Sequence, residues 1–134
     1  MKNKTTYIID DDKLSIKLVS LLLSRNQFCK AIFPFHNPNL ALDALRMNAD
    51  SLEDLPDIIL LDLNMPVLDG WQFLDEFVLL PLQKEIAVFI VTSSIDPFDI
   101  EKGKKYPIIK DYIMKPITSQ KLEHICQLVG ELIS

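Results

Sequence analysis

The 134-residue sequence predicts one α/β domain, in which helices cover both faces of a five-stranded parallel sheet in a doubly wound, three-layer arrangement. Two observations predict this fold class. Short apolar runs that are typical of buried strands alternate five times with longer stretches of helical periodicity. No repeat, linker or low-complexity segment interrupts the alternation, which is the order of elements that parallel strands require.

The first strand–helix unit occupies residues 7–25. Residues 7–9 form a short apolar strand that ends in three aspartates, and one of these acids is positioned to cap a helix over 13–25. The apolar residues with helical spacing in that helix are Leu14, Leu18, Leu21 and Leu22. A second strand is predicted over 29–35.

Two helices in this chain begin with the same signal, a polar capping residue followed by proline. Asn37-Pro38 predicts a helix that continues through 40–45, and a polar surface loop follows over 48–56. Asp96-Pro97 predicts a second helix, which Gly103 and Pro107 keep short.

The remaining elements lie on either side of that short helix. Strands are predicted over 57–61, 86–91 and 110–114, the first two apolar enough to be buried on both faces. A helix from about Trp71 to Leu80 stops at Pro81, and Thr118 caps a last helix that reaches Ile133. Asp69 is expected to cap the helix at Trp71, where the apolar group Trp71, Phe73, Leu74, Phe77 and Val78 is expected to be core.

Composition excludes several classes of protein. The net charge is −5 and no basic tract occurs, so nucleic-acid binding has little electrostatic support. No apolar run approaches membrane-spanning length, and the amino terminus lacks the apolar core of a signal peptide. Cys29 and Cys126 fall within apolar patterns, as buried thiols do in a reducing compartment. We therefore expect a cytoplasmic protein.

Reactive side chains follow four of the five predicted strands. Asp10 and Asp11 follow the first strand, Asp62 the third, Thr92 the fourth and Lys115 the fifth. Because the carboxyl ends of parallel strands meet at one edge of the sheet, these groups should converge there. Converging carboxylates without histidine or thiolate ligands favour a hard cation such as Mg²⁺, and an ionised aspartate can act as a nucleophile toward phosphorus.

These residues resemble the receiver domains of two-component response regulators, and the resemblance covers essentially the whole chain. It rests on the acidic run Asp10-Asp11, the block Asp62-Leu63-Asn64-Met65-Pro66 with Asp69-Gly70, and on Thr92, Tyr112 and Lys115-Pro116. The resemblance implies a flavodoxin-like, CheY-like fold with strand order 2-1-3-4-5, here as a single receiver domain over 1–134 without an output domain.

The resemblance also implies roles for individual residues. Asp62 is the expected phosphoacceptor, and Mg²⁺ is expected on Asp11, Asp62 and the backbone carbonyl of Asn64, with Asp10 acting through coordinated water. Lys115 should contact the phosphoryl oxygens, directed there by a cis peptide bond before Pro116.

Two further residues are expected to carry the signal. Thr92 should hydrogen-bond the phosphoryl group and Tyr112 should turn inward behind it. Asn64 and Ser94 border the expected route of the attacking water and should tune the lifetime of the phosphoryl group.

The expected function is two-component signal transduction by a phosphoacceptor that is not a conventional enzyme and that slowly loses its phosphoryl group. The expected partners are a sensor histidine kinase or histidine phosphotransfer protein and a downstream target. A second copy could instead bind the face formed by the fourth helix, fifth strand and fifth helix, because Leu128, Leu132 and Ile133 widen the apolar arc of the last helix. The loop Tyr106-Pro107 departs from the family pattern and affects this output face.

Two alternatives remain open on the sequence. A degenerate receiver could act as an interaction module without phosphorylation. A haloacid-dehalogenase-type phosphohydrolase would use Asp10 and Asp12, which have its Asp-x-Asp spacing, but it would leave the Asp62 block unexplained.

Overall fold

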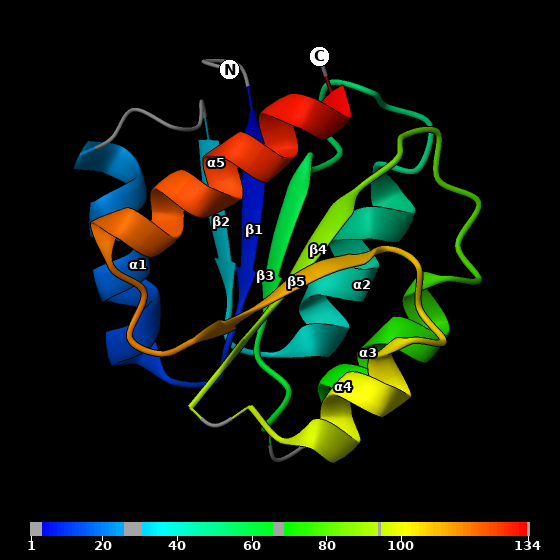
Figure 1. Ribbon diagram of the computed structural model, residues 1–134. Coiled ribbons are helices and arrows are strands. Elements are labelled where there is room, and N and C mark those ends of the chain that lie inside the picture. Colours follow the sequence, from blue (N-terminus) through cyan, green and yellow to red (C-terminus); the bar gives the residue numbers. More distant parts are fainter. Residues whose placement is uncertain (1–3, 26–30, 66–68, 94, 134) are drawn as a thin grey trace.

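The computed structural model describes residues 4–25, 31–65, 69–93 and 95–133, which form a five-stranded parallel sheet in the order β2-β1-β3-β4-β5 (Figure 1). The strands are β1 (Thr5–Ile9), β2 (Ala31–Phe35), β3 (Ile58–Leu61), β4 (Ala87–Thr92) and β5 (Ile109–Met114). The helices are α1 (Lys13–Arg25), α2 (Pro38–Met47), α3 (Gly70–Phe77), α4 (Pro97–Gly103) and α5 (Ser119–Ile133). The predicted fold class and strand order are confirmed.

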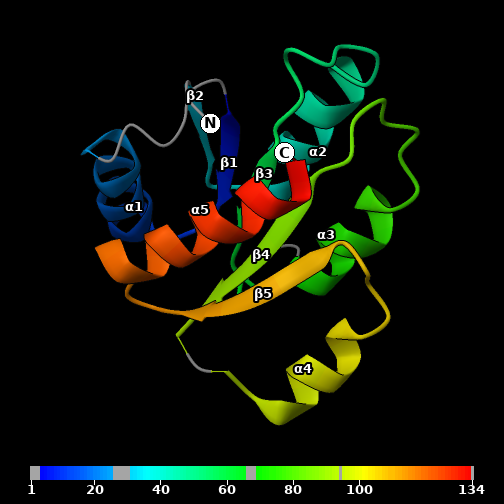
Figure 2. The same ribbon diagram turned by 45° about the horizontal axis from the view of Figure 1, so that its top comes forward.

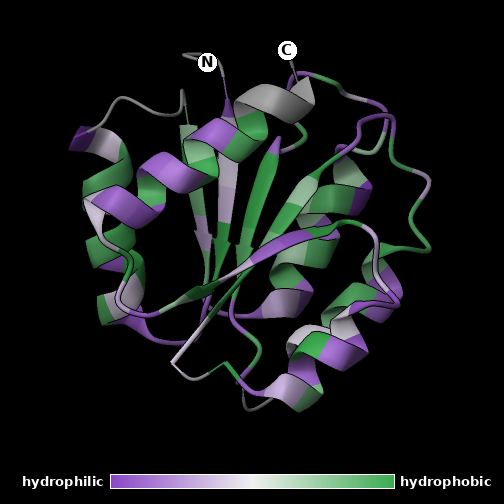
Figure 3. Ribbon diagram, in the orientation of Figure 1, coloured by the Kyte–Doolittle hydropathy of each residue, from purple (hydrophilic) through white to green (hydrophobic). Residues whose placement is uncertain are grey.

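Helices cover both faces of the sheet and create two separate cores. One core packs α1 and α5 against one face, and the other packs α2 and α3 against the opposite face. The central strands β3 and β4 are buried along their whole length, which explains their continuous apolar sequence (Figure 3). Helix α4 lies beyond the edge strand β5 and stands apart from the rest of the molecule in Figure 2, and of its residues only Gly103 is buried.

The predicted helix starts are confirmed by hydrogen bonds. Asn37 and Asp96 accept from the backbone N–H groups of Asn39 and Phe98, each at 2.9 Å. Asp69 accepts from the N–H of Gln72, whose side chain accepts from the Asp69 N–H, which completes a capping box.

The predicted helix over 13–25 is confirmed as α1, but most of the leucines that showed its periodicity do not face the sheet. Leu14, Leu18 and Leu21 are exposed by 63%, 51% and 53%, whereas the residues facing the sheet are Ile16, Val19 and Leu23. Both sets have helical spacing, so periodicity alone cannot choose between them. Helix α1 therefore presents a second apolar stripe to solvent.

Other boundaries differ by a few residues. Helix α3 ends at Phe77 rather than Leu80, so Val78 is 49% exposed and not part of the core. Leu40 in α2 is also exposed. Cys29 and the side chains of Leu132 and Ile133 lie outside what the structure describes. None of the helices in the described ranges combines the length and the apolar character needed to cross a bilayer.

Candidate functional site

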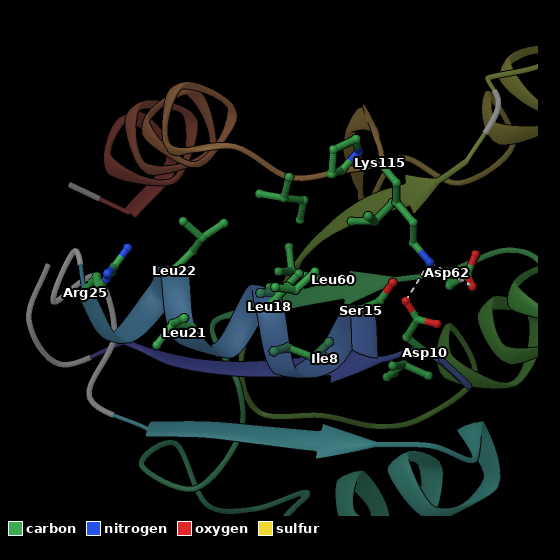
Figure 4. Close-up of a pocket in the computed structure, with 15 residues that line it drawn as sticks. Ile8, Asp10, Ser15, Leu18, Leu21, Leu22, Arg25, Leu60, Asp62 and Lys115 are labelled. Atoms are coloured by element: carbon green, nitrogen blue, oxygen red, sulfur yellow. Dashed lines mark hydrogen bonds and ion pairs between the residues drawn. The ribbon is translucent and has the colours of Figure 1, made fainter. Parts of the chain in front are cut away.

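Three carboxylates and one ammonium group meet at the carboxyl edge of the sheet. Oxygens of Asp10, Asp11 and Asp62 lie within 4.8 Å of one another. The Lys115 Nζ atom lies 2.7 Å from Asp10 Oδ2 and 3.5 Å from Asp62 Oδ2 (Figure 4). The predicted convergence of strand ends is therefore observed.

Backbone hydrogen bonds explain why Asp10 and Asp62 hold fixed positions. Each is the first residue beyond its strand, and each still belongs to the ladder: Asp10 N–H donates to Phe35 at 3.1 Å and Asp62 N–H to Ile9 at 2.9 Å. Each side chain also accepts a hydrogen bond from the backbone two residues further on. Asp10 Oδ1 accepts from the Asp12 N–H at 2.9 Å, and Asp62 Oδ1 accepts from the Asn64 N–H at 3.1 Å. The sheet thus sets the separation of these two acids.

The environment raises the pKa of Asp62 to about 6. Burial is the main cause, the hydrogen bond from the Asn64 N–H opposes it, and the negative charge of Asp10 adds to it. Burial acts to lower the pKa of Lys115, but the hydrogen bond and charge of Asp10, followed by those of Asp62, outweigh it and raise that pKa. Lys115 is therefore a permanent cation in the site.

The other predicted residues occupy distinct places around this centre. Thr92 is buried at the end of β4, with its Oγ1 atom 3.5 Å from the Asn64 side-chain nitrogen. Asp12 accepts from Leu14 N–H and from Ser15 at the start of α1, so it caps the helix. Ser94 lies outside the described residues, and the role of the Asn64 carbonyl stays a prediction.

The predicted cis peptide bond before Pro116 is confirmed, whereas the inward turn of Tyr112 stays a prediction. Tyr112 lies on the same face of the sheet as Thr92, because Ile90 pairs with Tyr112 and Thr92 with Met114. The Lys115–Pro116 bond is cis. The Tyr112 hydroxyl lies against Gly103 of α4.

Gly70 lets α3 begin directly against the Asp62 loop. Its N–H donates to Leu63 at 3.1 Å, and a Cβ atom there would come within 2.9 Å of the Asp62 carbonyl oxygen and the Leu63 Cα atom. Asp69 and Gly70 thus hold α3 against the loop that follows Asp62, and the predicted cap by Asp69 is confirmed.

A hollow of about 320 Å³ extends from Asp10, Asp62 and Lys115 along α1 (Figure 4). Its walls include the α1 side chains Leu18, Leu21 and Leu22, and it reaches Arg25 at the far end of the helix. The sequence does not predict this hollow, because helical spacing alone does not say which apolar stripe of α1 faces the sheet.

A second missed feature connects α3, α4 and the loop before β5. The Trp71 ring stacks on Tyr106 with centroids 5.6 Å apart, and the Lys102 ammonium lies 5.1 Å from the Trp71 ring centroid. The Tyr106 hydroxyl donates to Asp75. Only the unusual Tyr106-Pro107 loop could have suggested it from the sequence.

The family model for the response regulator receiver domain matches residues 6–127. The chain belongs to this family. Among solved structures, a two-component response regulator from Cytophaga hutchinsonii superimposes with a TM-score of 0.83 and 26% identity, covering 98% of this chain and 99% of that one.

Curated relatives match over the same region. They include the two-component response regulator ARR10 of Arabidopsis thaliana, 29% identical over 90% of this chain, and a protein-glutamate methylesterase/protein-glutamine glutaminase of Desulfotalea psychrophila, 36% identical over 87%. The chain spans 20% of the length of the first relative and 30% of the second. The shared property is therefore the receiver domain of two-component systems.

Receiver domains typically bind Mg²⁺ in an acidic pocket, and the residues present here fit that ion. Asp10, Asp11 and Asp62 supply carboxylate oxygens only, and Asp11 is exposed, which leaves room for the waters that Mg²⁺ retains. The raised pKa of Asp62 also fits a cation site, because burial and the Asp10 charge disfavour an ionised Asp62 and a bound cation would offset both effects.

Proposed function

We propose that this receiver is a phosphorylation switch, in which Asp62 accepts a phosphoryl group from the phosphohistidine of a histidine kinase or histidine phosphotransfer protein. The observation that supports it most is the single cluster of Asp10, Asp11, Asp62 and Lys115 at the sheet edge. This combination offers a nucleophile, a cation site and a fixed positive charge within one pocket.

In the proposed transfer, an ionised oxygen of Asp62 attacks phosphorus as the phosphorus–nitrogen bond of the donor breaks and the imidazole leaves. Mg²⁺ held by Asp11, Asp62 and the Asn64 carbonyl, with Asp10 acting through water, would neutralise charge on the phosphoryl oxygens. Lys115 adds a second positive charge from 3.5 Å, and Thr92 supplies a hydroxyl from the neighbouring strand. Asp62 reacts only when ionised, so its pKa of about 6 keeps it competent at neutral pH.

The partner that delivers the phosphoryl group must reach Asp62, and the apolar hollow along α1 leads there. Leu18 and Leu21 are half exposed on its wall, and Asp62 and Lys115 lie at its end (Figure 4). An exposed apolar groove next to the reacting carboxylate suits an amphipathic helix of the phosphodonor protein. We therefore place the donor on α1.

A matched pair of variants tests this placement. Leu18→Asp in α1 should slow transfer from a phosphorylated histidine phosphotransfer protein that is active on the wild type, while transfer from acetyl phosphate stays unchanged. Leu40→Asp is the control, because Leu40 is similarly exposed, by 56%, on helix α2. Equal transfer rates for both variants would place the donor elsewhere.

The output face is proposed on α4 and β5, where Phe98 is exposed by 74%, Ile100 by 40% and Met114 by 44%. Leu128 of α5 is half-buried and packs against the core, so it adds little to this face. Either a target protein or a second copy would cover these side chains. Sedimentation with and without beryllofluoride distinguishes them, since an unchanged monomer removes the dimer.

The alternatives make different predictions for one reaction. With Mg²⁺ and acetyl phosphate, a working receiver gains one acid-labile phosphoryl group, and Asp62→Asn abolishes it while Asp50→Asn at an exposed position does not. A degenerate interaction module gains no phosphoryl group from either acetyl phosphate or a histidine phosphotransfer protein. A phosphohydrolase would hydrolyse phosphate esters independently of Asp62, but Asp12 caps α1 and does not join the acidic cluster.

A further inference from the structure

Gly103, the last residue of α4, is glycine for reasons of space. Its backbone does not adopt the left-handed conformation, so no φ requirement favours glycine there. In a helix, alanine is the more stable choice. Gly103 is nevertheless buried on a helix that is otherwise exposed or half-exposed.

The tip of the Tyr112 side chain occupies the space next to Gly103. A Cβ atom on Gly103 would overlap the Tyr112 hydroxyl oxygen and would come within 3.0 Å of the ring carbon that bears it. The next neighbour, Ile109 Cδ1, would remain in ordinary contact at 3.5 Å. The observed position of Tyr112 therefore requires a residue without a side chain at 103.

Helix α4 has little freedom to move away from an added methyl group. Lys102, the residue before Gly103, lies over the Trp71 ring of α3, and Trp71 also stacks on Tyr106. The Tyr106 N–H donates to the Gly103 carbonyl at 2.9 Å. These contacts fix the Gly103 backbone, so rotation of the Tyr112 side chain is the easier adjustment.

We propose that Gly103 is a positioning residue, a notch on α4 that holds Tyr112 away from Thr92 in the unphosphorylated protein. A larger residue at 103 displaces the Tyr112 ring from this position. Tyr112 and Thr92 are diagonal neighbours on the same face of the sheet, so the displaced ring can move toward Thr92. The consequence for signalling rests on the proposed function: expelling the ring shifts the population toward the phosphorylated conformation without a phosphoryl group.

A double-mutant cycle tests the notch by thermal unfolding. Gly103→Ala should lower the midpoint temperature in the wild-type background, because the methyl group and the hydroxyl overlap. In the Tyr112→Phe background the hydroxyl is absent, and the same change should cost markedly less or raise the midpoint. An equal effect of Gly103→Ala in both backgrounds overturns the proposal.

The position of the ring itself is measured by ¹⁹F NMR of 3-fluorotyrosine-labelled protein. The chain has three tyrosines, and loss of a signal in Tyr112→Phe assigns Tyr112. Gly103→Ala should shift the Tyr112 signal without any ligand, in the direction that beryllofluoride with Mg²⁺ shifts it in the wild type. Glu101→Ala, an exposed change on the same helix, should leave the signal in place.

These outcomes separate the notch from the proposed function. A Tyr112 signal that Gly103→Ala leaves unmoved overturns the notch, whatever beryllofluoride does. A wild-type signal that beryllofluoride leaves unmoved contradicts the proposed switch, while the double-mutant cycle still decides the notch because it involves no phosphoryl chemistry.

Discussion

The pKa of Asp62 makes a quantitative prediction about Mg²⁺ binding. A proton and Mg²⁺ compete for the same carboxylate, so the apparent affinity for Mg²⁺ follows the ionised fraction of Asp62. With a pKa of about 6, that fraction falls from nearly all at about pH 7.5 to about a tenth at about pH 5. The dissociation constant should therefore rise about tenfold over this interval from the Asp62 proton alone. An aspartate with an ordinary pKa near 3.9 would change it by only about a tenth.

The single tryptophan provides the assay. Trp71 borders the same surface hollow as Asp11 and Asn64, so its fluorescence should respond when Mg²⁺ binds. Titrations with Mg²⁺ at a series of pH values give the dissociation constant directly, and Asp62→Asn should remove the dependence around pH 6. An affinity for Mg²⁺ that is the same at about pH 7.5 and about pH 5 would refute the reasoning, because Asp62 would then be ionised throughout.

Three further predictions concern stability. The pKa of Asp62 is higher in the folded than in the unfolded protein, so without Mg²⁺ the protein loses stability as pH rises from about 4 to about 6. Asp62→Asn removes this ionisation and should therefore raise the midpoint of thermal unfolding at neutral pH but not at about pH 4. Gly70→Ala forces a Cβ atom to within 2.9 Å of backbone atoms and should lower the free energy of unfolding by about 1–3 kcal/mol. The control, Asn39→Ala at an exposed position in the first turn of α2, should lower it much less. Equal midpoints of thermal unfolding for the two variants would contradict the close approach. Asp69→Ala removes the capping box and should lower stability by about 1 kcal/mol, seen as a midpoint about 3–6 °C lower; no change would mean that the cap contributes nothing.

The positions of the site residues could be predicted because they follow from topology. Asp10 and Asp62 each come directly after an apolar run, and parallel strands bring such residues to one edge whatever the details of packing. The helix starts at Asn37, Asp69 and Asp96 could be predicted for a similar reason, since a cap is a local interaction.

Long-range packing could not be predicted in the same way. Two apolar stripes run along α1, and only the position of α1 on the sheet determines that Ile16, Val19 and Leu23 face inward. The stack of Trp71 on Tyr106 joins segments that share no pattern in the sequence. Gly103 was interpreted only as the end of a short helix, because the overlap with Tyr112 depends on how far α4 lies from β5.

The central claim is that Asp62 is the phosphoacceptor, and reductive trapping tests it most directly. After incubation with Mg²⁺ and acetyl phosphate, borohydride reduces an aspartyl phosphate to homoserine, which peptide mass spectrometry then locates. We expect homoserine at position 62 and at no other aspartate, with none formed in Asp62→Asn. Homoserine at Asp10 or Asp11 in place of position 62 would contradict it.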